Sequence, residues 1–182
     1  MTMLIHREPA SDALPFALAA VKAHVRVTHD YENDALTTIA ATAALEIEQF
    51  AQIALLFQTV RVTIFDAQEG AGLTLPIGPV VGDAVPTVTI DGDAFDGFDF
   101  YPGNRPYIRW NTSPAWGKIG RIGIVYLAGF GATETDIPAD LAQALMDQAA
   151  LLYDARSPMD ERIRTTSPHM ARVGARYRGV RS

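Results

Sequence analysis

The residues best suited to chemistry lie at the C-terminal end, where arginines gather on an otherwise acidic chain. Between residues 160 and 182, six arginines stand against two acidic residues, a balance of +4 within a total net charge of −6. The other 159 residues therefore carry −10. Guanidinium groups contact phosphates without reading base sequence, so this segment is suited to binding nucleic acid. Spaced arginines also dock on acidic protein surfaces or stay solvated, and composition leaves these alternatives open.

An aspartate-rich stretch at residues 91–99 contains the oxygen ligands of a calcium loop but not their spacing. An EF-hand needs oxygen ligands at positions one, three and five, glycine at position six and glutamate at position twelve. Counted from Asp91, positions five, six and twelve hold Phe95, Asp96 and Pro102. The stretch is therefore predicted to form tight turns between short strands.

Other patterns of metal binding and catalysis are missing from the sequence. His24 and His29 lie five residues apart, which does not place both on one helical face, and the chain contains no cysteine. No nucleophile elbow, phosphate-binding glycine loop or dinucleotide fingerprint occurs. We therefore expect no cofactor, no metal and no enzymatic activity. An enzyme with an unrecognised site is an alternative that a deep pocket of perturbed acids would support.

Length and composition are those of one globular domain with extensions. No apolar run in the 182 residues approaches the roughly 18 residues needed to span a bilayer, so we expect no membrane partner. Residues 1–9 lack the apolar core of a signal peptide, which indicates synthesis in the cytoplasm without export. We divide the chain into a domain over residues 1–156 and a basic C-terminal arm over residues 157–182.

The elements that must position these residues centre on a helix predicted over residues 138–155. Gly129 and Gly131 end the apolar strand before it, and Pro138 suits the first helical turn. Polar residues occupy one narrow stripe of the helix, so it must bury more than one side. The second side is covered either within the same fold or by a neighbouring subunit. For the subunit contact we select Leu141, Leu145, Met146, Ala149, Ala150 and Tyr153.

The remaining elements complete an α+β pattern. Apolar residues at helical spacing predict helices over residues 15–26 and 32–51, whereas alternation predicts a strand with one wet face over residues 57–65. Residues 73–85 are interrupted by proline and glycine and read as an extended loop. Further short strands are expected at residues 87–90, 98–101, 107–110 and 120–128. The predicted fold packs N-terminal helices and a C-terminal helix with a small, mainly antiparallel sheet, followed by an extended C-terminal arm.

Several of these segments resemble the head–tail connector, or adaptor, proteins of long-tailed bacteriophages and related gene transfer agents. The resemblance covers roughly residues 18–156, and its most recognisable part is residues 126–131 followed by residues 137–145. In one departure, Gln52-Ile53-Ala54 follow the second helix, where the family often has a glycine. The other matching motifs are VKAHVRV at 21–27, NDAL at 33–36, AA at 43–44, IE at 47–48, LL at 55–56, LP at 75–76, PV at 79–80, and Tyr153 with Arg156.

The resemblance implies a structural role in a virion neck. It implies a homo-oligomeric ring, with twelve subunits expected, stacked beneath the portal protein after genome packaging. Such a ring extends the DNA channel and offers an attachment site to a tail-side connector or stopper protein. Genomic DNA would pass through without sequence-specific binding, and an acidic channel wall would repel it. For the tail-side partner we expect the loops at residues 91–99 and 111–118 to be exposed.

The arginine-rich arm is the expected contact with the portal. In a ring, weak contacts repeated in every subunit add up to strong attachment. The apolar residues of the arm favour a protein partner over DNA, although a nucleic-acid-binding module acting through the basic tail is the alternative reading. The expected portal contacts are Arg162, Arg164, Met170, Arg172, Val173, Arg176, Tyr177 and Arg178.

Overall fold

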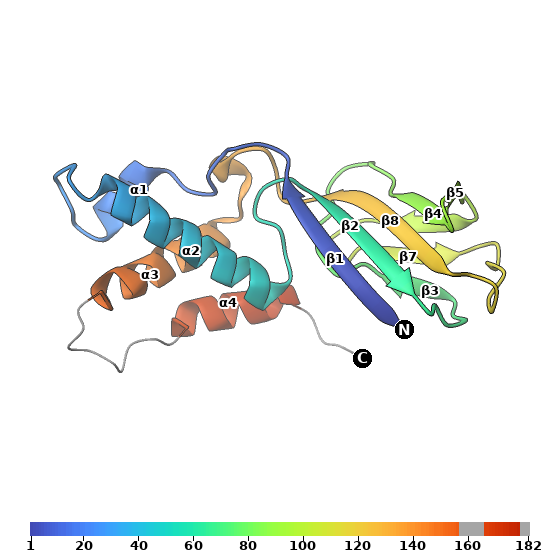
Figure 1. Cartoon of the computed structure of the whole chain (residues 1–182). Coiled ribbons are helices and arrows are strands. Elements are labelled where there is room, and N and C mark those ends of the chain that lie inside the picture. The colour runs from blue at the N-terminus through green and yellow to red at the C-terminus, as the bar shows by residue number, and fades with distance from the viewer. Residues whose placement is uncertain (157–165, 179–182) are drawn as a thin grey trace. The chain divides into compact units, whose positions relative to one another are not determined.

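The computed structural model describes residues 1–156 and 166–178, which form helices and two antiparallel sheets (Figure 1). The chain divides into two compact units. A β unit comprises Met1–Asp12 and Phe57–Phe130, and a helical unit comprises Ala13–Leu56 and Gly131–Ser182. The predicted α+β class is confirmed. The boundary expected at residue 156 falls inside the helical unit.

The β unit contains one sheet of five strands and one of three. The five-stranded sheet has the order β1-β2-β8-β4-β5, and the other has the order β3-β7-β6. Every pair of neighbouring strands is antiparallel. The strands are β1 (Thr2–Pro9), β2 (Gln58–Phe65), β3 (Gly72–Thr74), β4 (Thr87–Ile90), β5 (Asp93–Ala94), β6 (Phe98–Tyr101), β7 (Tyr107–Trp110) and β8 (Arg121–Ala128).

The core of the β unit follows from the two-residue period of its central strands. On β2, Val60, Val62 and Ile64 are buried, and Arg61 on the other face is exposed, as the alternation predicts. In register these three residues lie opposite Tyr126, Ile124 and Ile122 of β8, which are buried as well. Such cross-strand apolar pairs are what stabilises a sheet. The single mainly antiparallel sheet that we predicted is instead two antiparallel sheets.

Strand β1 is absent from the sequence prediction. Its apolar residues Met3, Leu4 and Ile5 are consecutive, so they give no alternating signal. The physical reason is its position at the edge of the sheet, where β2 is its only partner strand in the described part of the chain and most of its residues are exposed. A strand buried on neither face has no need of a two-residue apolar period.

The hydroxyl of Tyr126 ties β8 to the proline-rich segment that precedes β4. It donates a hydrogen bond of 3.0 Å to the carbonyl oxygen of Ile77 and accepts one of 3.2 Å from the Ile77 N–H. Both residues are buried, so this one side chain satisfies a donor and an acceptor that water does not reach. Burial is also the main reason why the pKa of Tyr126 is raised well above 10.

Tyr126→Phe is expected to lower the free energy of unfolding by about 1–3 kcal/mol, because it leaves both polar groups of Ile77 unpaired. Urea unfolding measures this, with Tyr101→Phe as a matched control at an exposed tyrosine. Because the folded-state pKa of Tyr126 is raised, its stabilising contribution is complete below about pH 10 and is lost as the pH rises further. The wild type should therefore lose stability above pH 10 more steeply than Tyr126→Phe. Equal losses in the two phenylalanine variants would contradict the assignment.

The described part of the helical unit packs four α-helices together. Helices α2 and α3 contact each other, and α4 contacts both; α1 also packs on α2 and α3. Small side chains such as Ala40, Ala43 and Ala144 are fully buried, which lets the helix axes approach closely. The helices are α1 (Leu18–His24), α2 (Asn33–Ala51), α3 (Ala139–Asp154) and α4 (Pro168–Arg178), with a short 3-10 helix at Glu134–Asp136.

The end of α2 explains the departure from the family pattern noted above. Gln52 follows the helix in the left-handed conformation, with φ 56° and ψ 46°, a position that glycine usually takes. Its side chain donates a hydrogen bond of 2.7 Å to the carbonyl oxygen of Gln49. The buried carboxylate of Glu48 then accepts a 2.7 Å bond from the Leu55 N–H, so the turn is held without a glycine.

The extended arm predicted after residue 156 is wrong for the part that the structure describes. Residues Pro168–Arg178 form helix α4, and Met170 and Val173 are buried against the helical unit. The apolar residues recur at 170, 173 and 177, which is the spacing of one helical face. Residues 157–165 and 179–182 lie outside the described residues.

Candidate functional site

The candidate site is the seam along which α4 docks on α2 and α3, since the arm that should reach the portal includes α4. The helix begins with a complete N-terminal cap. The Ser167 hydroxyl accepts a 3.0 Å hydrogen bond from the Met170 N–H, and Pro168 occupies the first helical position, where no N–H is required. The Ser167 carbonyl oxygen accepts the first helical bond from Ala171 at 2.9 Å.

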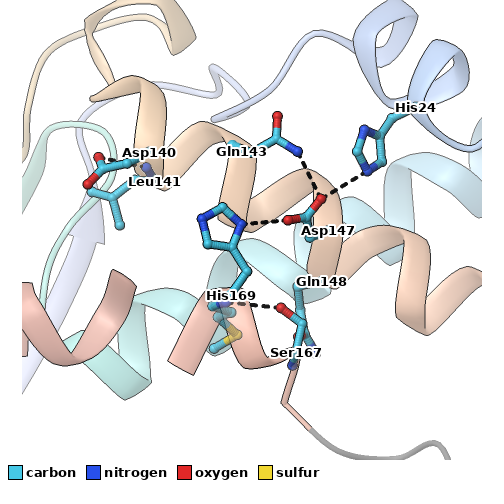
Figure 2. A network of polar contacts seen from close by, with 9 residues as sticks. His24, Asp140, Leu141, Gln143, Asp147, Gln148, Ser167 and His169 are labelled. Atoms are coloured by element: carbon cyan, nitrogen blue, oxygen red, sulfur yellow. Dashed lines mark hydrogen bonds and ion pairs between the residues drawn. The ribbon is translucent and has the colours of Figure 1, made fainter. Parts of the chain in front are cut away.

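A buried glutamine connects the three helices at this cap. Gln148 on α3 is only 2% exposed, and its Oε1 accepts a 2.7 Å hydrogen bond from the Ser167 N–H (Figure 2). Its Nε2 donates a 2.7 Å bond to Oε2 of Glu46 on α2. One amide thereby pairs a backbone donor at the start of α4 and a carboxylate on α2, so it fixes where α4 begins.

The apolar face of α4 lies close against α2. A Cβ atom added at Gly174 would stand 2.6 Å from Cδ1 of Phe50, which no real packing allows without movement. The position is therefore glycine because of close approach. Met170 and Val173 are buried beside it, and the guanidinium of Arg178 lies 5.7 Å from the centre of the Phe50 ring.

The polar stripe of α3 forms the other side of the seam. Asp147 accepts from His169 Nδ1 on α4 at 2.6 Å and from His24 Nε2 on α1 at 3.2 Å (Figure 2). Gln143 Nε2 donates to the same carboxylate at 2.8 Å. The side chains of Asp147, His24 and His169 are each about one-third exposed or less, so water reaches this cluster. Asp147 thus joins three helices through a single side chain.

A second carboxylate holds the far end of α4. Asp140 pairs with Arg176 at 2.9 Å and accepts a 3.0 Å hydrogen bond from the Tyr177 hydroxyl. Burial, and then this bond to Asp140, raises the pKa of Tyr177. Two of the arginine-arm residues thus already have a partner within the helical unit.

The C-terminal end of α3 is fastened to the start of α2. The Tyr153 hydroxyl donates a 2.6 Å hydrogen bond to Glu32, which lowers the pKa of Glu32 and raises the pKa of Tyr153. Arg156 stacks 3.8 Å over the Tyr153 ring and its Nη1 lies 3.3 Å from Glu32. Tyr153 and Arg156, which carry part of the family resemblance, therefore hold the C-terminal end of α3 against Glu32, at the start of α2.

The structure separates the six residues selected for the subunit contact into two sets. Leu141, Leu145 and Ala149 are buried within the helical unit of a single chain, against α2 and α4. Met146, Ala150 and Tyr153 are half-buried. The second set is the part of the α3 surface where a neighbouring subunit would find apolar side chains.

The residues expected to contact the portal are also divided. Arg162 and Arg164 lie outside the described residues. Met170 and Val173 belong to the core of the helical unit, and Arg176 and Tyr177 bind Asp140. Arg172 and Arg178 are exposed on α4, with Arg178 beside Phe50.

The sequence reading misses the residues of α3 and α1 that receive α4. Gln148 has no signal of its own, because a single glutamine on a helix is ordinarily a surface residue. The start of α4 does have one, since serine followed by proline is a typical N-terminal cap and first helical position. His24 is paired with Asp147 on α3, which is 123 positions away in the chain.

The side chains of the seam pack against one another and pair across helices. Among residues 1–156 and 166–178, no group of three or more histidine, cysteine or acidic side chains is placed to hold a metal ion. No helix in the described part of the chain is long and apolar enough to cross a membrane.

Comparison with solved structures identifies the kind of particle in which similar chains occur. A chain from the neck of an empty gene transfer agent (GTA) particle computed with C6 symmetry has a TM-score of 0.80 and 26% identity, covering 98% of this chain and 97% of that one. A chain from the virion of a native GTA particle has a TM-score of 0.74 and 28% identity, covering 97% and 96%. A chain from the neck of a native GTA particle computed with C12 symmetry gives 0.71 and 27%, covering 97% of each.

These matches support a structural protein of the neck of a phage-like particle. No protein-family model matches the chain, and no curated protein sequence matches it significantly. The match spans both units, so it supports more than a shared helical core. It also points to a structural rather than an enzymatic role.

Proposed function

We propose that this protein is a head–tail connector of the adaptor type, which forms a ring beneath the portal, extends the DNA channel and receives a tail-side protein. The observation that carries the proposal is the match to GTA neck chains over 97–98% of this chain. The sixfold and twelvefold symmetries of those necks agree with a ring, and twelve subunits is the number we propose. The half-buried Met146 and Ala150 on α3 are proposed to contact the neighbouring subunit.

The portal contact is proposed for arginines of the C-terminal segment other than Arg176. Arg176 is already paired with Asp140. Arg162 and Arg164, together with the exposed Arg172, are therefore the better candidates. This assignment also weakens the nucleic-acid alternative, because fewer cations remain free for phosphates.

The proposal is tested by solution mass, measured for the protein alone and mixed with the portal protein of the same particle. We expect a ring-sized species whose attachment to the portal is lost when Arg162, Arg164 and Arg172 are all replaced by glutamate. Truncation after Arg156 is a poorer test, because it removes Met170 and Val173 from the core of the helical unit. The matched control replaces Arg105, Arg109 and Arg121, which are exposed residues of the β unit, by glutamate.

Unchanged portal binding by the triple variant would remove the arm from the interface. Steeply salt-dependent binding to DNA, lost in the same variant, would favour the nucleic-acid reading instead. A protein that stays monomeric both alone and with the portal would contradict the ring.

A further inference from the structure

The five-stranded sheet of the β unit ends in an apolar edge strand. Among residues 1–156 and 166–178, strand β1 pairs with β2 alone, and Met1, Leu4 and Ile5 are 62%, 57% and 43% exposed. Long exposed edges of this kind template pairing with another strand, and proteins normally shorten, charge or cover them. The opposite edge is β5, which is only two residues long, contains Asp93 and lies between Asp91 and Asp96 in the chain. The two edges of one sheet thus differ in length and in charge.

The hydrogen bonds at β1 show which backbone groups face outward. The Ala10 N–H donates a 2.9 Å bond to the Phe57 carbonyl oxygen, and the β1–β2 register is unbroken from Thr2↔Phe65 to Pro9↔Gln58. Even-numbered residues therefore bond to β2, and the N–H and C=O groups of Met3 and Ile5 point away from it. Pro9, which has no N–H, falls in the outward set, where none is needed for the sheet.

The same argument applies at β5. The Phe95 N–H donates a 2.9 Å bond to the Val88 carbonyl oxygen, so the backbone groups of Ala94 point away from β4. In register, Ala94 lies opposite Thr89, Thr89 opposite Gly123, and Gly123 opposite Thr63, which pairs with Leu4. Side chains of opposed residues share a face, so Leu4 and Ala94 lie on the same face of the sheet.

The two edges fit each other if they run parallel. The five strands alternate in direction, so β1 and β5 point the same way, and a copy displaced around a ring presents β1 parallel to β5. In a parallel pair, a residue bonds to the two residues that flank the one opposite it. Ala94 opposite Leu4 would then bond to Met3 and Ile5, whose groups face outward. An antiparallel pairing of β1 with β5 would require one copy to be turned over, so that its exposed face would continue the buried face of the neighbouring sheet.

Charge favours the same register. With Ala94 opposite Leu4, Asp96 reaches the level of His6, and His6 is paired across the sheet with Arg61. Asp96 and Arg61 are both exposed. Between residues 87 and 99 there are four aspartates and no lysine or arginine, so the acidic edge would meet a cation.

We propose that β1 of one subunit pairs in parallel with β5 of the next, with Leu4 beside Ala94 and with Asp96 opposite His6, one strand away from Arg61. The proposal rests on the proposed ring. Rotational symmetry requires a contact between two different surfaces, which the two edges of one sheet supply. If β1 paired with β1 of another subunit, the two copies would form a closed dimer and could not add further subunits through this edge.

Engineered cysteines test the pairing directly, because the wild-type chain contains none. A chain with both Leu4→Cys and Ala94→Cys is expected to form, on oxidation, a ladder of disulfide-linked species that ends at the ring size. Mixing the two single variants should give only mixed dimers, since parallel neighbours bring the Cα atoms within disulfide range. Leu4→Cys with Val85→Cys, at another exposed position, is the matched control and should give no ladder.

A charge exchange supplies an independent measurement. Arg61→Asp and Asp96→Arg should each shift the concentration needed for ring formation upward, by about tenfold, and the double exchange should restore it. Circular dichroism confirms that each variant is folded. If the wild type forms rings but the double-cysteine chain gives no ladder, or Leu4→Cys links to itself, the pairing is overturned while the connector proposal stands. If the wild type forms no ring alone or with the portal, both fail.

Discussion

Val173→Asp is expected to release α4 from the helical unit. Val173 is 0% exposed, so the substitution removes a buried apolar side chain and places a carboxylate where nothing pairs with it. The cost should be about 3 kcal/mol or more, which exceeds what the surface pairs of α4 with Asp140 and Asp147 can retain. Hydrogen exchange measured by mass spectrometry should show rapid exchange across residues 168–178 and a smaller change in α2.

Arg172→Asp is the matched control for this experiment, because it introduces the same side chain one position away on the exposed face of α4. We expect its exchange pattern to stay close to that of the wild type. If Val173→Asp also leaves residues 168–178 protected, then α4 is not held by its apolar face. The same variant separates two parts of the connector proposal, since a released α4 should still carry its arginines to the portal.

Gln148→Leu is expected to lower the free energy of unfolding by about 2–4 kcal/mol. Leucine fills most of the space, but it leaves the Ser167 N–H without its acceptor and the Glu46 carboxylate without its donor. The buried N–H is the larger part of the cost, because the site is closed to water. Urea unfolding followed by circular dichroism measures the loss.

The control is Gln143→Leu, the same change one helical turn earlier on α3. Gln143 is exposed and donates only to Asp147 at the surface, so its loss should stay within about 0.5 kcal/mol. Comparable losses in the two variants would show that the Gln148 amide is not the connection between α2 and α4.

Elements with a single strong period are predictable from this sequence, and elements held by particular partners are not. Helix α2 and strand β2 each show one uninterrupted apolar face, and their observed bounds differ from the predicted ones by a residue. Helix α4 has eleven residues, four of them arginine or histidine, so its charge masks a short apolar face at Met170, Val173 and Tyr177. The N-terminal cap of α4 at Ser167 can be predicted from the local sequence.

The docking seam is harder to predict for a physical reason. Asp147 and Gln148 look like members of an ordinary polar stripe, because a periodic pattern reports which residues share a face and not what that face meets. Their partners come from α1, α2 and the start of α4, and the contacts join residues up to 123 positions apart. The resemblance to the adaptor family does not predict how α4 docks, since the resemblance ends at about Arg156 and α4 begins at Pro168.

The division of the chain into units has a consequence for synthesis on the ribosome. The β unit is complete once residues up to Phe130 have emerged, because β1 precedes its partner β2 and β8 is its last strand. Helices α1 and α2 emerge earlier, yet α3 and α4, which pack on them in the finished unit, come last. During synthesis the helical unit therefore passes through a stage in which Leu36, Ala40 and Ile47, which are buried in the folded protein, are exposed to solvent. This stage lasts while residues 57–130 of the β unit are made. Slowing translation before residue 139 should lengthen that stage and expose the chain to chaperones, whereas a permuted gene that joins the two helical segments directly would shorten it.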